Sequence, residues 1–404
     1  MDLKSGYPFW AISNGLLRTF PPLADDLRCD VAVIGGGITG AVIADALGAA
    51  GHEVAVLERR DIGWGSTCAS TALVQYEIDT SLSDLSARYG EDMAALAYRA
   101  CAQAVECVGA RAKSLGDVGG MRMRSVYLAS RPRDVDMLAD EYRLRRRHGL
   151  PVARCDAPTL ASRFGLRAPG ALVTRCAVGL DPYRMTYRLL ELLQRRGGSV
   201  HDRTTVERIV PHGRGVRLET VGGASVSARH AVLAAGYETQ GWLPERVARN
   251  RSTYAFASDP LAPAQLGALR DCMAWETARP YLYMRATPEG RVLVGGEDDV
   301  IDVPARRDAR VPHKVARLLK RMAQLAPSLA LVPAFGWGGT FAETADGLPF
   351  FGPHPALGPR VLAAMAYGGN GITYSVIGAD LLRARIERRA HPLARLFGFE
   401  RLAR

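Results

Sequence analysis

Residues 30–58 read DVAVIGGGITGAVIADALGAAGHEVAVLE, and this stretch decides the fold. Residues 30–34 form a nearly continuous apolar run, which is typical of a strand buried on both faces. An apolar helix is predicted over residues 41–50, where Gly51 stops it, and a second buried strand over residues 53–57. The order strand, helix, strand predicts a βαβ unit with two parallel strands.

The turn between the first strand and the helix, residues 35–40, has the G-x-G-x-x-G spacing of a dinucleotide-binding loop. Gly35 permits a tight turn, Gly37 lets the backbone approach a pyrophosphate, and Gly40 lets the helix pack against the sheet. The diphosphate then lies at the positive N-terminal end of the helix. Glu58 ends the second strand, where an acid hydrogen bonds to ribose hydroxyls and disfavours the 2′-phosphate of NADP. These features predict a dinucleotide site.

Two further loops favour FAD over NAD as the dinucleotide. Residues 61–67 read DIGWGST and are followed by Ser70 and Thr71, a glycine- and hydroxyl-rich loop that suits a segment passing a flavin ring. Residues 367–373, YGGNGIT, form a second junction of strand, glycine turn and helix, whose helix N-terminus could stabilise a reduced, anionic flavin. Because the chain has no second G-x-G-x-x-G, we predict no separate NAD(P)H domain and expect electrons to come from a small substrate.

The ordered set of motifs resembles that of FAD-dependent oxidoreductases of the D-amino-acid oxidase, glycine oxidase and sarcosine oxidase type. The set comprises residues 35–40 with Glu58, GWGST at 63–67, VLAAG at 232–236, DGLP at 346–349 and the turn at 368–373. The resemblance runs from residue 30 to about residue 382. It implies that Val206 contacts the adenine side and that Ser66 and Thr67 lie near the pyrophosphate or flavin. It also implies oxidation of the C–N bond of an amine or amino acid by hydride transfer to flavin N5.

Two departures from that family pattern bear on the chemistry. Sarcosine oxidase-type members can attach FAD through a cysteine near residues 337–344, where this chain has none, so we predict non-covalent FAD. Those oxidases also carry an oxygen-activating lysine on the strand that matches residues 291–295, which here read RVLVG. The electron acceptor therefore stays open between oxygen and another redox carrier.

The predicted site residues form a cofactor set and a substrate set. The cofactor set comprises Gly35, Gly37, Ile38, Thr39, Gly40, Glu58, Arg59, Gly65, Ser66, Thr67, Ser70, Thr71, Val206, Ala235, Gly236, Gly369, Asn370, Gly371, Ile372 and Thr373. On the substrate side, Arg285 could pair bidentately with a carboxylate, and Tyr283 or Tyr254 could hydrogen bond to it. His354 could lie near the flavin ring, and residues 75–77 could line the pocket. Ordinary structural roles are also open for these residues: Arg285 as a surface arginine, Tyr283 and Tyr254 as core tyrosines, and His354 as a solvated loop histidine.

Strands and helices alternate at the start, middle and end of the chain, which predicts the α/β class. We expect a Rossmann-like FAD-binding domain built from the discontinuous segments 1–80, 176–248 and 330–404. Residues 81–175 and 249–329 are predicted to form an inserted mixed-sheet α+β substrate domain. Within these segments, the pattern over residues 81–115 is helical throughout, and another helix is predicted over residues 313–325.

Composition limits the class of protein further. The 404 residues are 48% hydrophobic and 23% charged, and no apolar stretch approaches the ~20 residues of a membrane span. We recognise no signal peptide, and the seven scattered cysteines form no CxxC pair, so a cytoplasmic protein without disulfides or a metal cluster is expected. The formal charge of +11 is mostly arginine spread along the chain, which does not favour nucleic acid as a partner.

Two alternatives to the oxidation of a small amine or amino acid stay open. The same flavin could oxidise a hydroxy acid or a polyol phosphate, with arginines binding the anion. A flavoprotein that acts on modified tRNA is also compatible with the basic charge, and salt-dependent tRNA binding would distinguish it.

Overall fold

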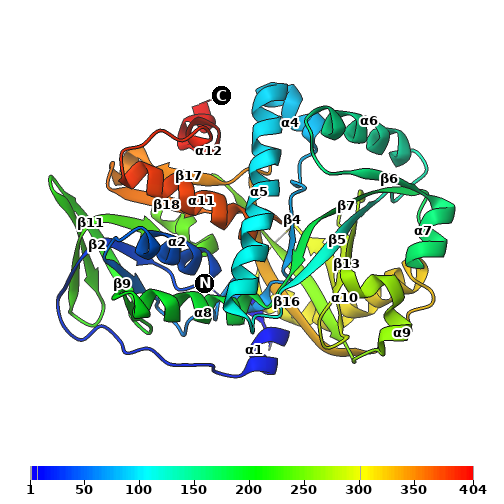
Figure 1. Cartoon of the computed structure of the whole chain (residues 1–404). Helices are drawn as coiled ribbons and strands as arrows, with labels where there is room; N and C mark the ends of the chain where they lie inside the picture. The colour runs from blue at the N-terminus through cyan, green and yellow to red at the C-terminus, as the bar shows by residue number, and fades with distance from the viewer. Residues whose placement is uncertain (1, 7, 301, 404) are drawn as a thin grey trace.

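The computed structural model describes residues 2–6, 8–300 and 302–403, whose strands form two sheets in two lobes (Figure 1). The strands of the smaller sheet are β2 (Leu27–Ile34), β3 (Val54–Leu57), β8 (Ser199–His201), β9 (Val206–His212), β10 (Gly215–Thr220), β11 (Ser225–Leu233), β17 (Phe350–Pro353) and β18 (Val361–Met365). Their order is β17-β18-β11-β2-β3-β8, with β10 beside β11 and β9 beside β10. The central strands from β18 to β8 run parallel, as in a dinucleotide-binding domain.

The larger sheet is mainly antiparallel. Its strands are β1 (Lys4–Ser5), β4 (Leu73–Gln75), β5 (Met121–Leu128), β6 (Ala153–Asp156), β7 (Gly170–Gly179), β12 (Arg249–Ser258), β13 (Cys272–Glu276), β14 (Leu282–Ala286), β15 (Val292–Asp299) and β16 (Pro333–Glu343). Their order is β1-β16-β12-β15-β14-β13-β5-β7-β4, with β6 beside β7. The chain therefore has the predicted α/β fold with a second, mixed-sheet lobe.

Helices cover both sheets and separate the lobes. They are α1 (Phe9–Asn14), α2 (Ile38–Ala49), α3 (Ser66–Ala69), α4 (Leu82–Tyr89), α5 (Glu91–Leu115), α6 (Asp134–Arg147), α7 (Ala157–Phe164), α8 (Pro182–Arg195), α9 (Pro263–Leu266), α10 (Pro304–Leu325), α11 (Gly371–Ile386) and α12 (Ala394–Phe397). Helix α2 packs against both α8 and α11, and α5 stands between the two lobes in Figure 1. None of the helices in the described residues is long and apolar enough to cross a membrane.

The predicted βαβ unit is confirmed. Strand β2 pairs in parallel with β3, in the register Val31 with Val54, and α2 connects them. The side chains of β2 alternate between two hydrophobic clusters, with Val31 and Val33 in one and Ala32 and Ile34 in the other. This burial on both faces explains why the strand reads as an apolar run.

Two predicted helices differ from the structure at their boundaries. The helical pattern over residues 81–115 divides into α4 and α5 at Gly90, whose φ of 86° no helix accommodates. Helix α10 begins at Pro304, before the predicted start, and continues past Pro312. Its first turns are held by Arg307, a fully buried side chain that bonds to Ser5 and Thr340 across β1 and β16. Tertiary burial thus overrides the local effect of the proline.

The predicted division into domains differs from the sheets at three strands. β1, β4 and β16 lie in segments assigned to the FAD-binding domain, yet all three belong to the larger sheet. In addition, β7 continues across the predicted boundary at residue 176. The reason is non-local pairing: β16 runs antiparallel to β12 from Arg249 opposite Glu343 to Ser258 opposite Pro333. A local pattern identifies a strand without identifying its neighbour.

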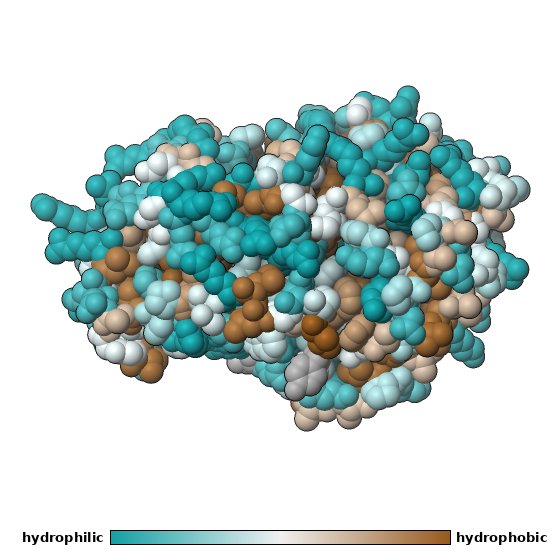
Figure 2. All heavy atoms as spheres, turned by 60° about the horizontal axis from the view of Figure 1, so that its bottom comes forward, coloured by the Kyte–Doolittle hydropathy of each residue, from teal (hydrophilic) through white to brown (hydrophobic). Residues whose placement is uncertain are grey.

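The surface is ordinary for a globular protein. On the face in Figure 2, hydrophobic side chains occur in small groups separated by hydrophilic ones. The exposed large hydrophobic residues include Ile12 and Leu16, beside or within α1.

Candidate active site

A cavity between the two sheets takes its lining from both lobes. The smaller lobe contributes the glycine turn after β2, the ends of β3 and β11, and the start of α11. The larger lobe contributes side chains of β12 to β16, among them Thr253, Trp275, Tyr283 and Asp298. Of the twenty predicted cofactor residues, all except Gly40 line this cavity. The structure therefore brings together motifs that are more than 300 residues apart in the chain, such as Gly35 and Thr373.

The glycine turn has the close contacts that its spacing predicts. Gly35 has φ of 116°, and a Cβ atom there would lie 2.3 Å from the Ala234 carbonyl oxygen. A Cβ atom on Gly40 would lie 1.9 Å from the Gly35 carbonyl oxygen, so Gly40 lets α2 pack against the turn instead of lining the cavity. Gly37 is the N-cap of α2 and supplies no side chain to cap its N–H groups. Apart from the Ile38 N–H, which Thr67 binds, the N–H groups of the first turn are thus left for an anion.

Glu58 lies at the end of β3 and is held by the backbone. Its Oε2 accepts a hydrogen bond from the Gly36 N–H at 2.7 Å, and its Oε1 accepts one from the Arg60 N–H at 2.8 Å. Burial raises the pKa of Glu58, and these two hydrogen bonds oppose that rise. Each carboxylate oxygen keeps a second lone pair, which a ribose hydroxyl can use. Arg59 and Arg60 both pair with Glu238 beside this end of the cavity.

The loop after β3 supplies hydroxyl groups to the cavity. Thr67 Oγ1 accepts a hydrogen bond from the Ile38 N–H at 2.9 Å, which ties α3 to the first turn of α2. Ser66 Oγ is buried, lines the cavity and has no partner among the residues that the structure describes, so a bound ligand can satisfy it. Two tryptophans hold the loop from outside the cavity: Trp337 donates to the Ala69 carbonyl and Trp10 to the Ser70 carbonyl.

The start of α11 is tied to the segment that follows β4. Asn370 Nδ2 donates to the Glu77 carbonyl at 2.7 Å, and Thr373 Oγ1 donates to the Gln75 carbonyl at 3.1 Å. The Gly369 N–H donates to Asp79 Oδ2 at 2.7 Å. Among the predicted residues 75–77, Gln75 lines the cavity, whereas the other two do not. Both lobes therefore fix the position of the α11 N-terminus.

Of the four predicted substrate residues, only Tyr283 lines the cavity. Tyr254 lies in the second hydrophobic cluster, and its hydroxyl donates to Asp299 at 2.8 Å. His354 is buried against Phe399 and its Nε2 lies 2.7 Å from Glu245 Oε1. Neither side chain reaches the cavity, because Tyr254 packs on the other face of the larger sheet and His354 lies just after β17, among residues outside the cavity lining.

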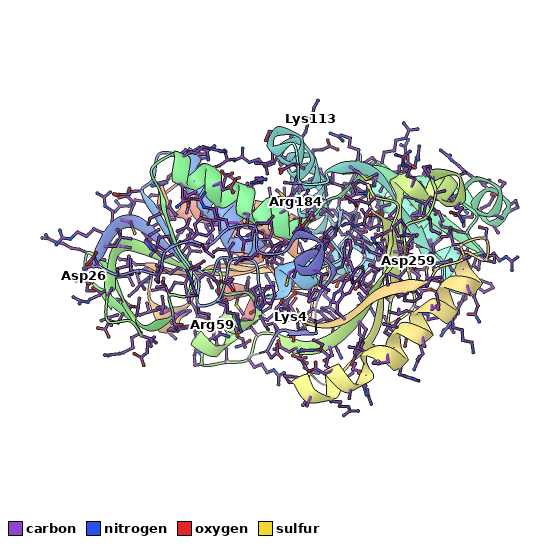
Figure 3. All side chains as sticks on the ribbon, turned by 90° about the horizontal axis from the view of Figure 1, so that it is seen from below. Lys4, Asp26, Arg59, Lys113, Arg184 and Asp259 are labelled. Atoms are coloured by element: carbon purple, nitrogen blue, oxygen red, sulfur yellow. The ribbon has the colours of Figure 1, made fainter. Side chains whose placement is uncertain are left out.

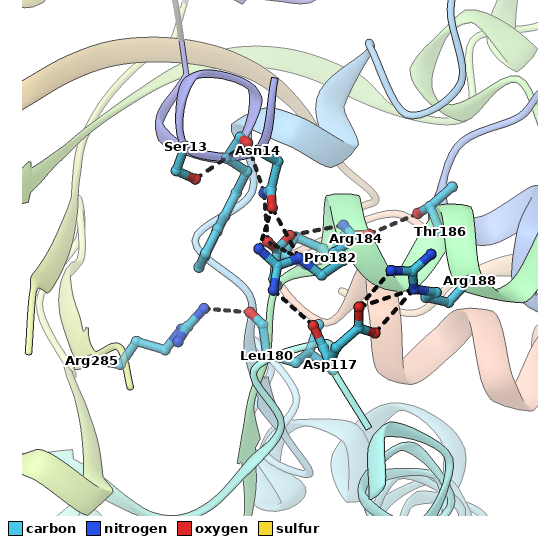
Figure 4. A network of polar contacts seen from close by, with 11 residues as sticks. Ser13, Asn14, Asp117, Leu180, Pro182, Arg184, Thr186, Arg188 and Arg285 are labelled. Carbon is cyan, nitrogen blue, oxygen red and sulfur yellow. Dashed lines mark hydrogen bonds and ion pairs between the residues drawn. The ribbon is translucent and has the colours of Figure 1, made fainter. Parts of the chain in front are cut away.

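Arg285 also lies outside the cavity, and it is fully buried rather than on the surface. Its Nε donates to the Thr71 carbonyl at 2.7 Å. Its Nη2 donates to the Leu180 carbonyl at 2.6 Å (Figure 4). The guanidinium also lies over the ring of Trp10, and burial lowers its pKa to about 10. Alternation along β14 correctly puts Arg285 on the same face as Tyr283, but the arginine lies past the end of the cavity. These contacts give Arg285 a structural role instead of the predicted carboxylate-binding role.

Several cavity residues carry no recognisable motif. Thr253 lies on β12 and Trp275 on β13, and Tyr281 directly precedes β14. The Trp275 and Tyr281 rings meet edge to face at 6.0 Å. Asp79 and Asp298 are the two acids at this end of the cavity, and burial raises the pKa of both. Strand alternation could have indicated Tyr281, whereas nothing in the sequence separates Asp298 from its neighbours.

A β-bulge turns Asp298 towards the cavity. The pairing of β12 with β15 shifts between Ser252, opposite Asp299, and Tyr254, opposite Gly296. Glu297, with φ of 58°, takes the extra position, and its carboxylate binds arginines of α10. Burial raises the pKa of Asp298 to about 6, while Thr253 lowers it by hydrogen bonding. Among the remaining charges, Glu343 and Asp79 raise this pKa and Arg279 lowers it.

Comparison with known proteins agrees with the cavity. A family model described as FAD dependent oxidoreductase matches residues 30–385, and the chain belongs to this family. It is therefore an FAD-dependent oxidoreductase, as its motifs predict.

Three relatives cover nearly the full length of the chain. Glycine oxidase of Geobacillus kaustophilus is 27% identical, over 90% of this chain and 94% of the relative. Its crystal structure has a TM-score of 0.78 at 23% identity, over 92% of this chain and 98% of the other. Gamma-glutamylputrescine oxidoreductase of Escherichia coli is 25% identical over 94% of this chain and 89% of its own length. The tRNA 5-methylaminomethyl-2-thiouridine biosynthesis bifunctional protein MnmC of Ralstonia nicotianae is 26% identical over 89% of this chain, which spans 58% of that protein.

Proposed function

We propose that this chain oxidises a C–N bond of a small amine or amino acid, with FAD held non-covalently between the lobes. One observation carries the proposal: a single cavity joins a dinucleotide cradle in the smaller lobe to an aromatic, acceptor-rich chamber in the larger lobe. The relatives that are named for glycine and gamma-glutamylputrescine support an amine nitrogen next to the oxidised carbon.

The residues that would hold FAD follow from the contacts of the smaller lobe. The first turn of α2 faces the diphosphate, Glu58 the ribose and Val206 the adenine side. Ser66 supplies a hydroxyl with no other partner to the pyrophosphate or flavin. The N-terminus of α11 provides a partial positive charge for a reduced, anionic flavin.

The chemistry that FAD supplies is acceptance of a hydride from the substrate carbon, so that the amine becomes an imine and loses one proton to solvent. The chain's own residues position the amine and exclude water from it, chiefly through Trp275, Tyr281 and Tyr283. The neutral amine lone pair assists the departure of the hydride. No protein base is required, and the rate rests on positioning and on the α11 dipole.

Non-covalent attachment is supported by the cysteines. All seven are described, and none of them lines the cavity. Cys68, which lies in the loop next to Thr67, is buried with its Sγ directed at the Gly65 carbonyl. Burial raises its pKa to about 12, which keeps it an unreactive thiol.

The direct test is anaerobic mixing of the purified yellow protein with amines, amino acids, hydroxy acids and polyol phosphates. We expect an amine or amino acid to bleach the flavin absorbance, and acid precipitation to release the flavin into the supernatant. Bleaching by hydroxy acids alone would overturn the proposal, and flavin that stays with the acid precipitate would overturn non-covalent attachment.

A second candidate is oxidation of an amine carried on tRNA, which the similarity to the MnmC protein favours and with which the basic charge is compatible. Contacts with RNA phosphates would make binding fall steeply with salt. Retention of tRNA by the purified protein at low salt, and its loss at higher salt, would support this candidate over a free amine.

A further inference from the structure

The charged residues that line the cavity are divided between its two ends. The cations that line it among the described residues are Arg59 and Arg60, which lie beside Glu58 and pair with Glu238. The end built on the larger sheet has Asp79 and Asp298 and, within the described part of the lining, no lysine or arginine. A carboxylate-bearing substrate would therefore face two acids without a matching cation.

The nearest cations on this side are already engaged. Arg285 lies outside the cavity, where its guanidinium donates hydrogen bonds to backbone carbonyls. Arg279 lies over the Tyr281 ring, pairs with Glu343 at 3.6 Å and donates to the Asp79 carbonyl at 3.0 Å, outside the cavity lining. Neither arginine is placed to form a bidentate pair with a substrate carboxylate.

Unpartnered acceptors face the same space. Asp298 Oδ1 and Gln75 Oε1 are both buried and have no hydrogen-bond partner in the described part of the chain, and both residues line the cavity. Gln75 is only 8% exposed, so water does not satisfy it freely. A buried acceptor without a partner is costly, and a donor-rich ligand removes that cost. An ammonium group carries up to three N–H donors and no acceptor.

The remaining lining suits a cation equally well. Trp275, Tyr281 and Tyr283 present aromatic rings around the acids, and Tyr237 and Phe341 add two more. Aromatic faces attract ammonium groups through the ring quadrupole, most strongly where water is excluded. Acids, free acceptors and aromatic rings thus favour one kind of ligand.

We propose that this end of the cavity selects a cationic amine that lacks a carboxylate on its oxidised carbon. Asp298 is the residue that binds its ammonium group, which then releases one proton to solvent so that the neutral amine can react. The proposal rests on the proposed C–N oxidation and specifies its substrate class. The β-bulge at Glu297 is the structural device, because regular alternation would place Asp298 on the α10 side of the sheet.

Matched pairs of compounds test the substrate class. Phenethylamine and phenylalanine, putrescine and ornithine, and dimethylamine and sarcosine differ only by the carboxylate. Anaerobic flavin reduction is measured against the concentration of each, with both enantiomers of the chiral acids. We expect the preferred amine to half-saturate reduction at a concentration at least tenfold below that of its amino acid. Equal or better saturation by the amino acids would overturn the inference and leave C–N oxidation intact.

The variant Asp298→Asn tests the residue. It keeps the size and one acceptor but removes the charge, so we expect at least a tenfold rise in KM for the best amine, with a smaller change in kcat. Asp259→Asn is the matched control, since Asp259 follows β12 in the larger lobe (Figure 3). Its side chain is well exposed and does not line the cavity. Flavin content and thermal stability report on folding. An unchanged KM in folded Asp298→Asn enzyme contradicts the assignment.

If Asp298→Asn does not retain FAD, binding of tert-butylammonium to the wild-type holoenzyme replaces it. This ion keeps three N–H donors and has no hydrogen on the carbon next to nitrogen, so it cannot be oxidised. A flavin spectral shift with saturation in the millimolar range or below supports the cation site. Absence of binding up to high concentration, or competition by acetate that is as strong, refutes it. Failure of every amine and amino acid to reduce the flavin would instead refute the proposed function itself.

Discussion

Substitution of Gly40 by alanine tests whether α2 and the glycine turn form one rigid cofactor cradle. The new Cβ atom would lie 1.9 Å from the Gly35 carbonyl oxygen, whereas real Cβ atoms essentially never come closer than 3.0 Å. Both sides of this contact are backbone, so no side chain can rotate to relieve it. The first turn of α2 must therefore move away from the strand, and the diphosphate site moves with it.

The magnitude follows from overpacking. Inserted methyl groups in a tight site cost typically about 1–3 kcal/mol, and a contact between backbone atoms belongs at the upper end. The higher helix propensity of alanine stabilises the helix by at most ~1 kcal/mol relative to glycine. The net penalty is roughly 2 kcal/mol, which corresponds to about a thirtyfold change in an equilibrium constant. If the helix shifts in the apoprotein, the penalty appears as weaker FAD binding; otherwise it appears as lower stability.

The assay is titration of apoprotein with FAD by flavin fluorescence, together with thermal unfolding of the apoprotein. Gly48→Ala is the matched control, because it makes the same change in the same helix but meets only the mobile end of the Leu193 side chain, at 2.7 Å. We expect Gly40→Ala to lose at least tenfold in affinity or several degrees in Tm, and Gly48→Ala to change neither by much. Wild-type affinity and Tm in Gly40→Ala would refute the reasoning.

Three further predictions concern the larger lobe and its supports. Because burial raises the pKa of Asp298 to about 6, the carboxyl is neutral below that pH. Binding of tert-butylammonium should therefore become tighter as pH rises through 6 in the wild type. Asp298→Asn should weaken this dependence, and Asp79, whose pKa burial also raises, accounts for what is left. Arg145 is buried and bonds to Glu141 at 2.8 Å, so Arg145→Met should lower the free energy of unfolding by about 3–5 kcal/mol in urea titrations. The exposed neighbour Arg147, changed to methionine, should lower it by less than about 1 kcal/mol. Arg285→Lys cannot satisfy the same carbonyls and should lower Tm with KM for substrate unchanged, whereas a raised KM at wild-type Tm would restore the carboxylate-binding role.

The cofactor half of the site is predictable because its determinants are local. A tight turn, a close backbone approach and a helix N-terminus each require particular residues at fixed spacing, and Gly35 and Glu58 mark them in one short segment. The turn at residues 367–373 repeats the same logic, so it is recognisable despite its distance from the first turn. The assignment of strands to the two sheets is harder to predict, because the sequence pattern of β16 would be the same in either sheet.

The substrate half is hard to predict for a different physical reason. Tyr283 and Arg285 lie on one face of one strand, yet only the first reaches the cavity, because strand alternation fixes a side chain's face but not what lies opposite it. Tyr254 and His354 fail for the same reason, since their partners come from distant segments.

The bulge at Glu297 shows how such a fold can change its substrate without changing its cofactor. One extra residue in β15 exchanges the faces of the residues after it, so that Glu297 meets the arginines of α10 and Asp298 meets the cavity. The cradle around α2 lies in the other sheet and does not depend on that register. The sign of the charge at the substrate end can therefore be reset by a local rearrangement at the end of a single strand.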